Sequence, residues 1–249
     1  MLTNSKLLPT ELGSAVETTN AYSTSVQSLF SHFFRAEKTP EKLVRVSDDE
    51  SETAEYMLIE HGCGDRLAAE KFIARCFAES FGARVDAFMP RLFTVRRSDG
   101  SICGAFGLRS AQRKLFIEQY LEQPIERAIA THAGSVVERR SIVEVGHFSS
   151  AFPGAMRALI LLLIERLRHE GFEWVTFAAT IQLHNALLRM GLFPIDLDAA
   201  TATAIPVEAR SAWGRYYDHA PRVLAGRIRD GFAALTCATG TPSGNRSSA

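Results

Sequence analysis

One carboxylate stands in a strand-like run of apolar residues. Glu144 lies within 142–148 (IVEVGHF), where most of its neighbours are β-branched, aromatic or small. Burying a carboxylate is costly unless the group is paired or performs chemistry, so two interpretations stay open. Glu144 is either a general base that takes a proton from an attacking amine, or a structural group bound to Arg109, Arg139 or Arg140.

His147 is the second candidate base, because the reference pKa of an imidazole lies near neutrality. The alternative is a histidine that is satisfied near the core. Side chains of a regular strand alternate between its two faces, so Glu144 and His147, three positions apart, would point in opposite directions. A β-bulge would bring both into one site, and Gly146 between them favours a bulge.

A turn-rich loop at 149–154 (SSAFPG) precedes a helix whose apolar residues have helical spacing from 155 to 167. The first N–H groups of a helix bind anions, Gly154 lets the backbone approach a ligand closely, and Arg157 adds positive charge. The alternative is a plain helix-entry turn. Ser149 and Ser150 are expected to be loop or cap hydroxyls, since no G-x-S-x-G motif surrounds them.

A strand–helix–strand unit must position these candidates. Gly171 suits the left-handed end of the helix, and 174–179 (WVTFAA) predicts a second strand, which such a crossover makes parallel to the first. The remaining pattern predicts a strand at 55–61, a helix at 67–80, a hairpin over 92–108, a helix at 124–131, an edge strand at 193–195, a short helix at 206–213, and an apolar element of open type at 222–235.

Composition excludes several classes of protein. Lys+Arg and Asp+Glu each total 28, so the basic excess of a nucleic-acid-binding protein is absent. The four cysteines share no metal-ligand spacing, so we expect reduced thiols and no metal. The longest apolar run, 158–164, is far shorter than the roughly 20 residues of a transmembrane helix, and the start lacks a signal-peptide pattern. We therefore expect a soluble, cytoplasmic protein.

Three parts are predicted along the chain. Residues 1–50 are expected to form an N-terminal arm, partly helical around the apolar piece 26–34, and an acidic stretch at 47–55 marks its end. Residues 51–235 form the folded domain. The small, polar tail 236–249 is expected to be disordered.

Several pieces in order carry a family resemblance, among them IVEVGHFSS at 142–150, PGAMRAL at 153–159, LLRMGL at 187–192 and WGRYYDHAP at 213–221. Through them the chain resembles the bacterial thermostable hemolysin family and the GNAT superfamily of N-acetyltransferases, and it is similar to acyl-homoserine-lactone synthases. The resemblance implies an α/β (α+β) fold with a mixed, mostly antiparallel central sheet and helices on both faces. The strands at 142–148 and 174–179 would be parallel and splayed.

The resemblance also implies a donor site beside the first of these strands. The phosphopantetheine arm of acyl-CoA or of an acyl-carrier protein would lie there as a co-substrate, with no tightly bound cofactor. The superfamily loop carries Gln or Arg where Ala151 stands, and Gly or Ala where Met156 stands, which leaves room for a carrier-protein donor. The positions that match the donor site are Phe148, Ser149, Ser150, Gly154, Ala155 and Arg157.

On the acceptor side, three residues are candidates for substrate binding: Arg109, Glu118 and Asn185. Their alternatives are a structural salt bridge, a structural buried carboxylate and a helix-surface amide. The tyrosine that many GNAT enzymes use as a general acid falls on Leu187 here. Tyr216 and Tyr217 are either substitutes for it or packed aromatic residues.

The implied activity is transfer of an acyl group from acyl-CoA or an acyl-carrier protein to an amine of a small metabolite, by direct attack with Glu144 or His147 as the base. Two other classes stay open. One is a membrane-active, lytic protein, as the family's name suggests, with 26–34 as its apolar stretch. The other is a catalytically degenerate fold that binds a thioester or a protein partner. A homodimer is also left open.

Overall fold

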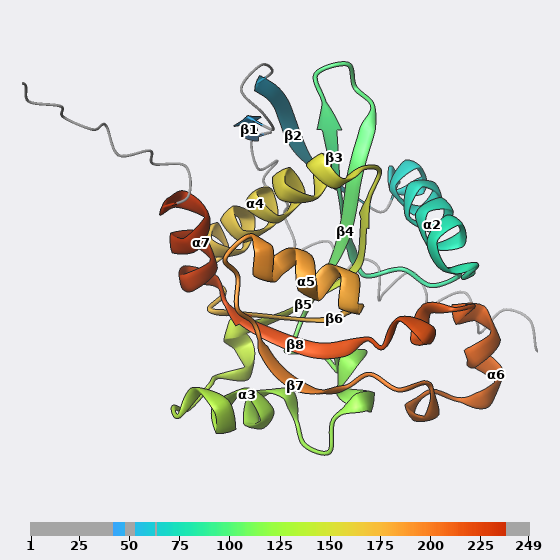
Figure 1. Cartoon of the computed structure of the whole chain (residues 1–249), viewed down its shortest axis with the longest axis vertical. Coiled ribbons are helices and arrows are strands. Elements are labelled where there is room, and N and C mark those ends of the chain that lie inside the picture. Colours follow the sequence, from blue (N-terminus) through green and yellow to red (C-terminus); the bar gives the residue numbers. More distant parts are fainter. Residues whose placement is uncertain (1–41, 48–52, 63, 238–249) are drawn as a thin grey trace, which may run out of the picture. The chain divides into compact units, whose positions relative to one another are not determined.

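The computed structural model describes residues 42–47, 53–62 and 64–237. Eight strands form one sheet in the order β1-β2-β3-β4-β5-β6-β8-β7 (Figure 1). The strands are β1 (Lys42–Ser47), β2 (Thr53–His61), β3 (Arg91–Arg97), β4 (Ile102–Ser110), β5 (Ile142–Ser150), β6 (Trp174–Ala179), β7 (Ile195–Ala199) and β8 (Arg222–Arg227). The pair β5–β6 is parallel and the other neighbouring pairs are antiparallel, so the predicted mixed sheet is confirmed.

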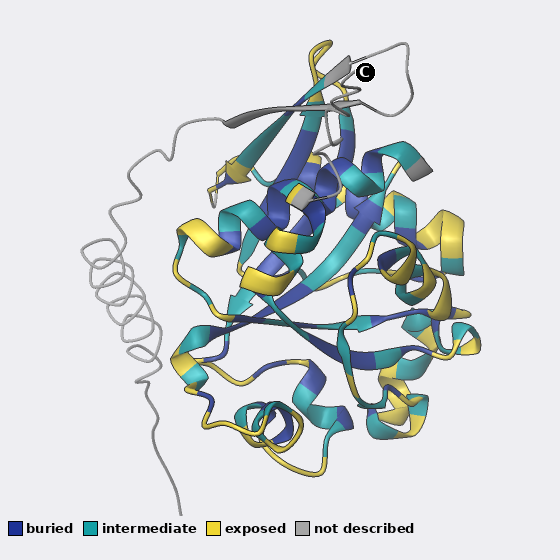
Figure 2. Ribbon diagram, turned by 60° about the vertical axis from the view of Figure 1, so that its left-hand side comes forward, coloured by how far each residue is buried: buried dark blue, intermediate teal, exposed yellow. Residues whose placement is uncertain are grey.

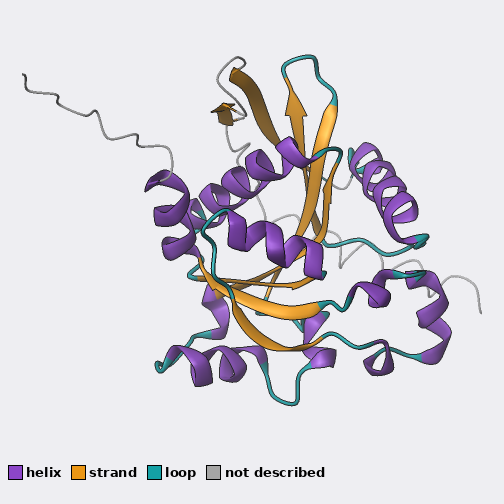
Figure 3. Ribbon diagram, viewed as in Figure 1, coloured by secondary structure: helices purple, strands orange, loops and turns teal. Residues whose placement is uncertain are grey.

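Helices fill most connections between the strands (Figure 3). The α-helices are α2 (Leu67–Phe81), α3 (Ile125–Ala133), α4 (Pro153–His169), α5 (Ile181–Arg189), α6 (Val207–Arg210) and α7 (Ile228–Cys237). Short 3-10 helices are η1 (Ile117–Tyr120), η2 (Arg139–Ser141), η3 (Ala202–Ala204), η4 (Ser211–Trp213) and η5 (Tyr216–His219). The element of open type at 222–235 is a strand followed by a helix, β8 and α7.

The N-terminal boundary differs from the expectation. Strand β1 pairs along its length with β2, from Lys42 opposite Leu58 to Ser47 opposite Thr53. The sheet therefore begins at Lys42, inside the segment 1–50 that was expected to be an arm. The apolar piece 26–34 and the tail from residue 238 on lie outside the described residues.

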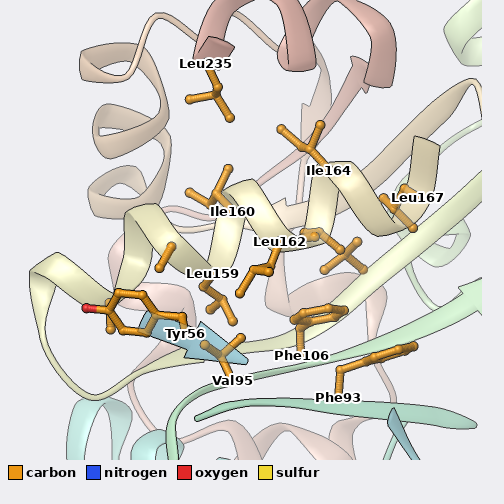
Figure 4. Packing of buried hydrophobic residues seen from close by; sticks show 14 of the residues in the cluster. Tyr56, Phe93, Val95, Phe106, Leu159, Ile160, Leu162, Ile164, Leu167 and Leu235 are labelled. Carbon is orange, nitrogen blue, oxygen red and sulfur yellow. The ribbon is translucent and has the colours of Figure 1, made fainter. Parts of the chain in front are cut away.

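Alternation along the strands gives the sheet two apolar faces. Phe93 stacks on Phe106 across β3 and β4 at 4.9 Å, and both lie under α4 in a core cluster that also includes residues of α5 and α7 (Figure 4). Leu92, the neighbour of Phe93, faces the other way and packs against α2. Farther along that second face, Ile142 and Trp174 pack with α3 and η1. The middle of the sheet is consequently buried on both sides (Figure 2).

Glycines follow the ends of two helices, at Gly171 as the sequence predicts and also at Gly82. Gly171, just after α4, has φ 78°, and Gly82 closes α2 with φ 64°. Only glycine adopts this left-handed conformation without strain. Among the described residues, no helix is both long enough and apolar enough to cross a bilayer.

Candidate active site

Strands β5 and β6 separate in the middle of the sheet. The register pairs them at three positions, ending with Glu144 opposite Thr176. Beyond that point β5 continues to Ser150 beside β4, and β6 continues to Ala179 beside β8. A cavity of about 1840 Å³ lies here, and residues of both strands line it, including Gly146–Phe148 and Phe177–Ala178. The predicted splay is therefore present and it opens a site.

Glu144 stands at the point where the strands part. Its side chain is buried, with 1% of the residue exposed. Its carboxylate accepts hydrogen bonds from the N–H groups of Phe116 at 3.0 Å and Ile117 at 3.1 Å. Arg109 lies directly opposite on β4, with Nη1 3.5 Å from Oε2. Of the three expected arginine partners, only Arg109 contacts Glu144, because Arg139 and Arg140 bind other carboxylates.

The electrostatics of Glu144 suit a proton acceptor. Burial raises the pKa of its carboxyl group above the ordinary value, while the Phe116 N–H and then Arg109 pull that pKa down. A carboxylate with a raised pKa is a stronger base than a solvated one. Glu144 lines the cavity, so it can reach a bound amine directly or through one water.

A β-bulge brings His147 into the same cavity. Gly107 pairs with Gly146 and Ala105 with Ser149, so Phe106 of β4 faces two residues of β5. His147 has φ 55°, which is left-handed backbone. The bulge that Gly146 predicts is thus present, and it overcomes the alternation that would separate His147 from Glu144.

The imidazole of His147 is mostly enclosed by aromatic rings. Phe88 lies 5.5 Å and Phe77 6.1 Å from it, measured between ring centroids. The Met89 N–H points at Nδ1 from 3.4 Å. Burial, followed by the charge of Arg109, lowers the pKa of His147 to about 4. His147 is therefore uncharged at neutral pH.

The loop between β5 and α4 forms the opposite edge of the cavity. Five of the six residues expected in the donor site line it: Phe148, Ser149, Ser150, Gly154 and Arg157. Ala155 does not, because its side chain is buried in the core and its N–H donates to Phe152 O at 3.2 Å. Gly154 is the first residue of α4 with an N–H group, since α4 begins at Pro153.

The hydroxyls of this loop bind the main chain. Ser149 Oγ donates to His147 O at 3.0 Å, and Ser150 Oγ donates to Phe152 O at 2.7 Å. These bonds agree with the expected loop hydroxyls. They hold the backbone on either side of Ser149 in one shape beside the bulge.

Glu118 and Asn185 lie away from the cavity, whereas Arg109 lines it. Arg139 binds the Glu118 carboxylate at 2.6 and 2.8 Å, and the N–H groups of Leu115 and Ile125 also donate to it. These contacts lower the pKa of Glu118 to about 2, and the hydrogen bond from Arg139 is the largest cause. Glu118 ties η1 to α3, and Asn185 is exposed on α5. The structure therefore supports the structural alternative for both.

The tyrosines after Gly214 are packed among aromatic residues. Tyr217 shares a hydrogen bond of 2.7 Å with the hydroxyl of Tyr120. Tyr216 lines the cavity, and its hydroxyl is 3.4 Å from the carbonyl oxygen of Ala178, in the part of β6 that pairs with β8 but no longer with β5. Burial raises the pKa of Tyr216 strongly, so its hydroxyl stays protonated. Leu187, at the superfamily's tyrosine position, is a buried apolar residue beside the cavity.

Residues on α2, η1 and η4 also line the cavity, and the sequence analysis did not single them out. The large aromatic ones are Phe77 and Phe81 on α2, Trp213 on η4 and Phe116 just before η1. Each lies in a segment of ordinary apolar pattern, so no local signal separates it from core. The cluster WGRYY at 213–217 was the one visible hint of an aromatic surface.

The parting of β5 and β6, the bulge at His147 and the cavity between the strands define a GNAT-like fold. A sequence model described as "Thermostable hemolysin" matches residues 59–232. The chain belongs to the thermostable hemolysin family. The family resemblance stated from the sequence is confirmed.

Solved structures share this architecture at low sequence identity. TofI, in its apo form, superposes with a TM-score of 0.51 and 15% identity over 72% of this chain and 95% of its own. For the AHL synthase LasI the TM-score is 0.49 and the sequence identity 10%, and the match covers 83% of this chain and 100% of LasI. For FeeM, an N-acyl amino acid synthase from uncultured soil microbes, the TM-score is 0.49 and the sequence identity 12%. That match covers 75% of this chain and 98% of FeeM. No curated protein matches the sequence.

Proposed function

We propose that this protein is an acyltransferase that moves an acyl group from acyl-CoA or an acyl-carrier protein to an amine of a small metabolite. The observation that carries the proposal is the buried Glu144 at the point where β5 and β6 part, facing a cavity of about 1840 Å³. Most ligand pockets measure roughly 300–1,000 Å³. This cavity has room for a phosphopantetheine arm, an acyl chain and an acceptor together.

The backbone beside the cavity suits the donor. The edge of β5 that β6 leaves free after Glu144 offers amide groups that an amide-bearing arm can pair with. The start of α4 and Arg157 offer positive charge for a phosphate. The same site accepts free CoA or a carrier protein, because both present the same arm and phosphate.

The reaction needs one base and one acid. Glu144 takes a proton from the bound ammonium, directly or through water. The freed amine attacks the thioester carbonyl, an amide C–N bond forms, and the C–S bond breaks. As the C–S bond breaks, the nitrogen loses its second proton, which reaches the departing thiolate directly or through water. The first proton stays on Glu144 until it passes to solvent, so atoms and charge balance. His147, neutral at this pH, is the alternative base and lines the same space.

Thiol release from a panel of acyl-CoAs and acyl-carrier proteins, measured with a panel of amines, tests this function. We expect amine-dependent release that Glu144→Gln lowers by about 100-fold or more, the range of general base catalysis. Thermal melting with CoA gives a second readout. No thiol release with any pair, together with no shift of the melting temperature by CoA, would refute the proposal.

A further inference from the structure

We infer that the part of the cavity beneath α2 and the 211–219 segment binds the acceptor, and that this acceptor is a primary amine on an aromatic or similarly flat apolar body that lacks a carboxylate. This inference rests on the proposed acyl transfer. It goes further by naming the chemical class of the amine.

A continuous series of rings lines this part of the cavity. The series starts at His147, and successive ring centroids are 6.1, 6.5, 5.3 and 5.6 Å apart. It ends at Phe116, whose backbone N–H binds the Glu144 carboxylate. We call these five residues the aromatic wall: His147, Phe77, Tyr216, Trp213 and Phe116, all of which line the cavity. The wall therefore runs from His147, one candidate base, to Phe116, which binds Glu144, the other candidate base.

The charged groups on this side favour an ammonium over a carboxylate. Arg109 faces Glu144, and the exposed Arg84 binds Asp86 at 2.7 Å. His147 carries no charge, since burial lowers its pKa to about 4. Each of these arginines already faces a carboxylate. An acceptor carboxylate would be repelled by Glu144, whereas an ammonium would be attracted to Glu144 and to the ring faces.

Backbone hydrogen bonds fix the width of the compartment. The Arg84 N–H donates to Ala212 O at 2.6 Å, and the Arg215 N–H donates to Phe81 O at 2.8 Å. Between them Gly214 has φ 51°, and a Cβ there would lie 2.3 Å from Phe81 O. These bonds join the end of α2 to the segment that carries Trp213 and Tyr216. A slot held at fixed width between rings fits a flat body better than a branched or strongly hydrated one.

Matched ligands test the inference on the full chain. Both tryptophans line the cavity, Trp213 in the wall and the buried Trp174 farther along it, so quenching of tryptophan fluorescence reports binding. We would titrate 2-phenylethylamine, phenylalanine and isoamylamine, and then use the same three as acceptors with an acyl thioester. We expect 2-phenylethylamine to bind at least about tenfold more tightly than either of the others, and kcat/KM to follow the same order.

Two variants sharpen the experiment. Phe116→Leu removes one exposed ring of the wall and is expected to weaken 2-phenylethylamine binding about fivefold or more. Leu67→Ala, at an exposed position outside the cavity, is the control and is expected to change nothing. Circular dichroism and melting confirm that both variants fold.

The outcomes separate the two levels of the argument. Equal or tighter binding of phenylalanine or isoamylamine overturns the inference. Acylation of phenylalanine but not 2-phenylethylamine also overturns it and leaves the proposed function standing. Selective binding of 2-phenylethylamine without acylation of any amine supports the assignment of the compartment and contradicts the proposed function.

Discussion

Gly107 and Gly146 face each other across β4 and β5, and the side chain of Met89 fills the space that two side chains would occupy. A Cβ on Gly107 would lie 2.3 Å from Met89 Cβ. A Cβ on Gly146 would lie 2.4 Å from Met89 Cε. This pair lets the 82–90 loop lie directly on the strands next to the bulge. It thereby sets the position of His147.

The two glycines are expected to respond differently to a second mutation. Gly107→Ala and Gly146→Ala should each lower the free energy of unfolding by about 1–3 kcal/mol, the cost of overpacking. In a Met89→Ala background, Gly146→Ala should become nearly neutral, because the clashing Cε is gone. Gly107→Ala should stay costly, because Met89 Cβ remains. Chemical denaturation of the single and double mutants measures the cost of each glycine substitution with and without the Met89 side chain.

Gly62→Ala is the matched control, since no atom lies within 4 Å of its Cβ position. Its stability should equal that of the wild type within error. An equal cost at Gly107 and Gly146 in both backgrounds would contradict the packing described around Met89.

The pH dependence of turnover tests Glu144 as the base. A base must be deprotonated, so kcat/KM should fall as the pH drops through the pKa of Glu144. Burial raises that pKa, so the fall should begin above the ordinary glutamate value of 4.5. Glu144→Gln should remove this acid limb together with most of the activity, whereas Glu118→Gln should retain the limb. An unchanged profile in Glu144→Gln would exclude Glu144.

His147→Asn distinguishes the two candidate bases. Asparagine tolerates positive φ and cannot act as a base in this range. If Glu144 is the base, the variant should keep kcat/KM within about threefold, whereas loss of the proton acceptor itself costs about 100-fold or more. Loss on that larger scale, in a variant that melts normally, would assign the base to His147.

The titration of His147 can be followed directly. Its pKa is lowered to about 4, below the unfolded value of 6.5, so the unfolded chain binds the proton first as the pH falls. His147 should therefore reduce stability progressively between about pH 6.5 and 4. Its imidazole resonances should stay constant from pH 8 to 5. A midpoint near 6.5 by NMR would contradict the enclosed ring.

Arg157→Ala probes the phosphate end of the donor. The variant should raise KM for acyl-CoA by about tenfold, the value of one charge-assisted hydrogen bond of about 1.5 kcal/mol. It should not alter KM for a short acyl thioester that lacks phosphate. Arg140→Ala, at an exposed position bound to Glu138, is the control. An equal rise in KM for both donors would argue against phosphate binding at Arg157.

Glu118 should matter for stability at neutral pH. Its folded pKa of about 2 lies below the ordinary value of 4.5, so its contribution is present above pH 4.5 and is lost as the pH falls toward 2. Glu118→Gln should lower the free energy of unfolding at pH 7 by about 2 kcal/mol, because Arg139 loses a charged partner. The difference from the wild type should shrink in acid. A difference that does not change with pH would contradict this assignment.

Local patterns predicted most of the elements. The Asp99-Gly100 turn forms as expected, with Gly100 at φ 82° and the Ser101 N–H bound to Asp99 Oδ1 at 2.8 Å. Strand β1 was missed because an edge strand gains its stability by pairing with a neighbour, here β2, and not from its own short pattern. Pairing with a neighbour leaves no signal in the strand's own residues.

The site was only partly predictable for the same reason. Glu118 and Glu144 look alike in sequence, because each interrupts an apolar run. The fold separates them, since Arg139 reaches Glu118 from 21 positions away and the cavity opens at Glu144. The aromatic wall comes from segments spread between Phe77 and Tyr216, which meet only after the sheet has formed.

Across its middle the sheet is joined by the three paired positions of β5 and β6, and α4 connects those same two strands. The two halves of the sheet therefore share only a short ladder of backbone hydrogen bonds at this point. Mutations that extended this ladder would draw the far ends of β5 and β6 together and narrow the cavity between them.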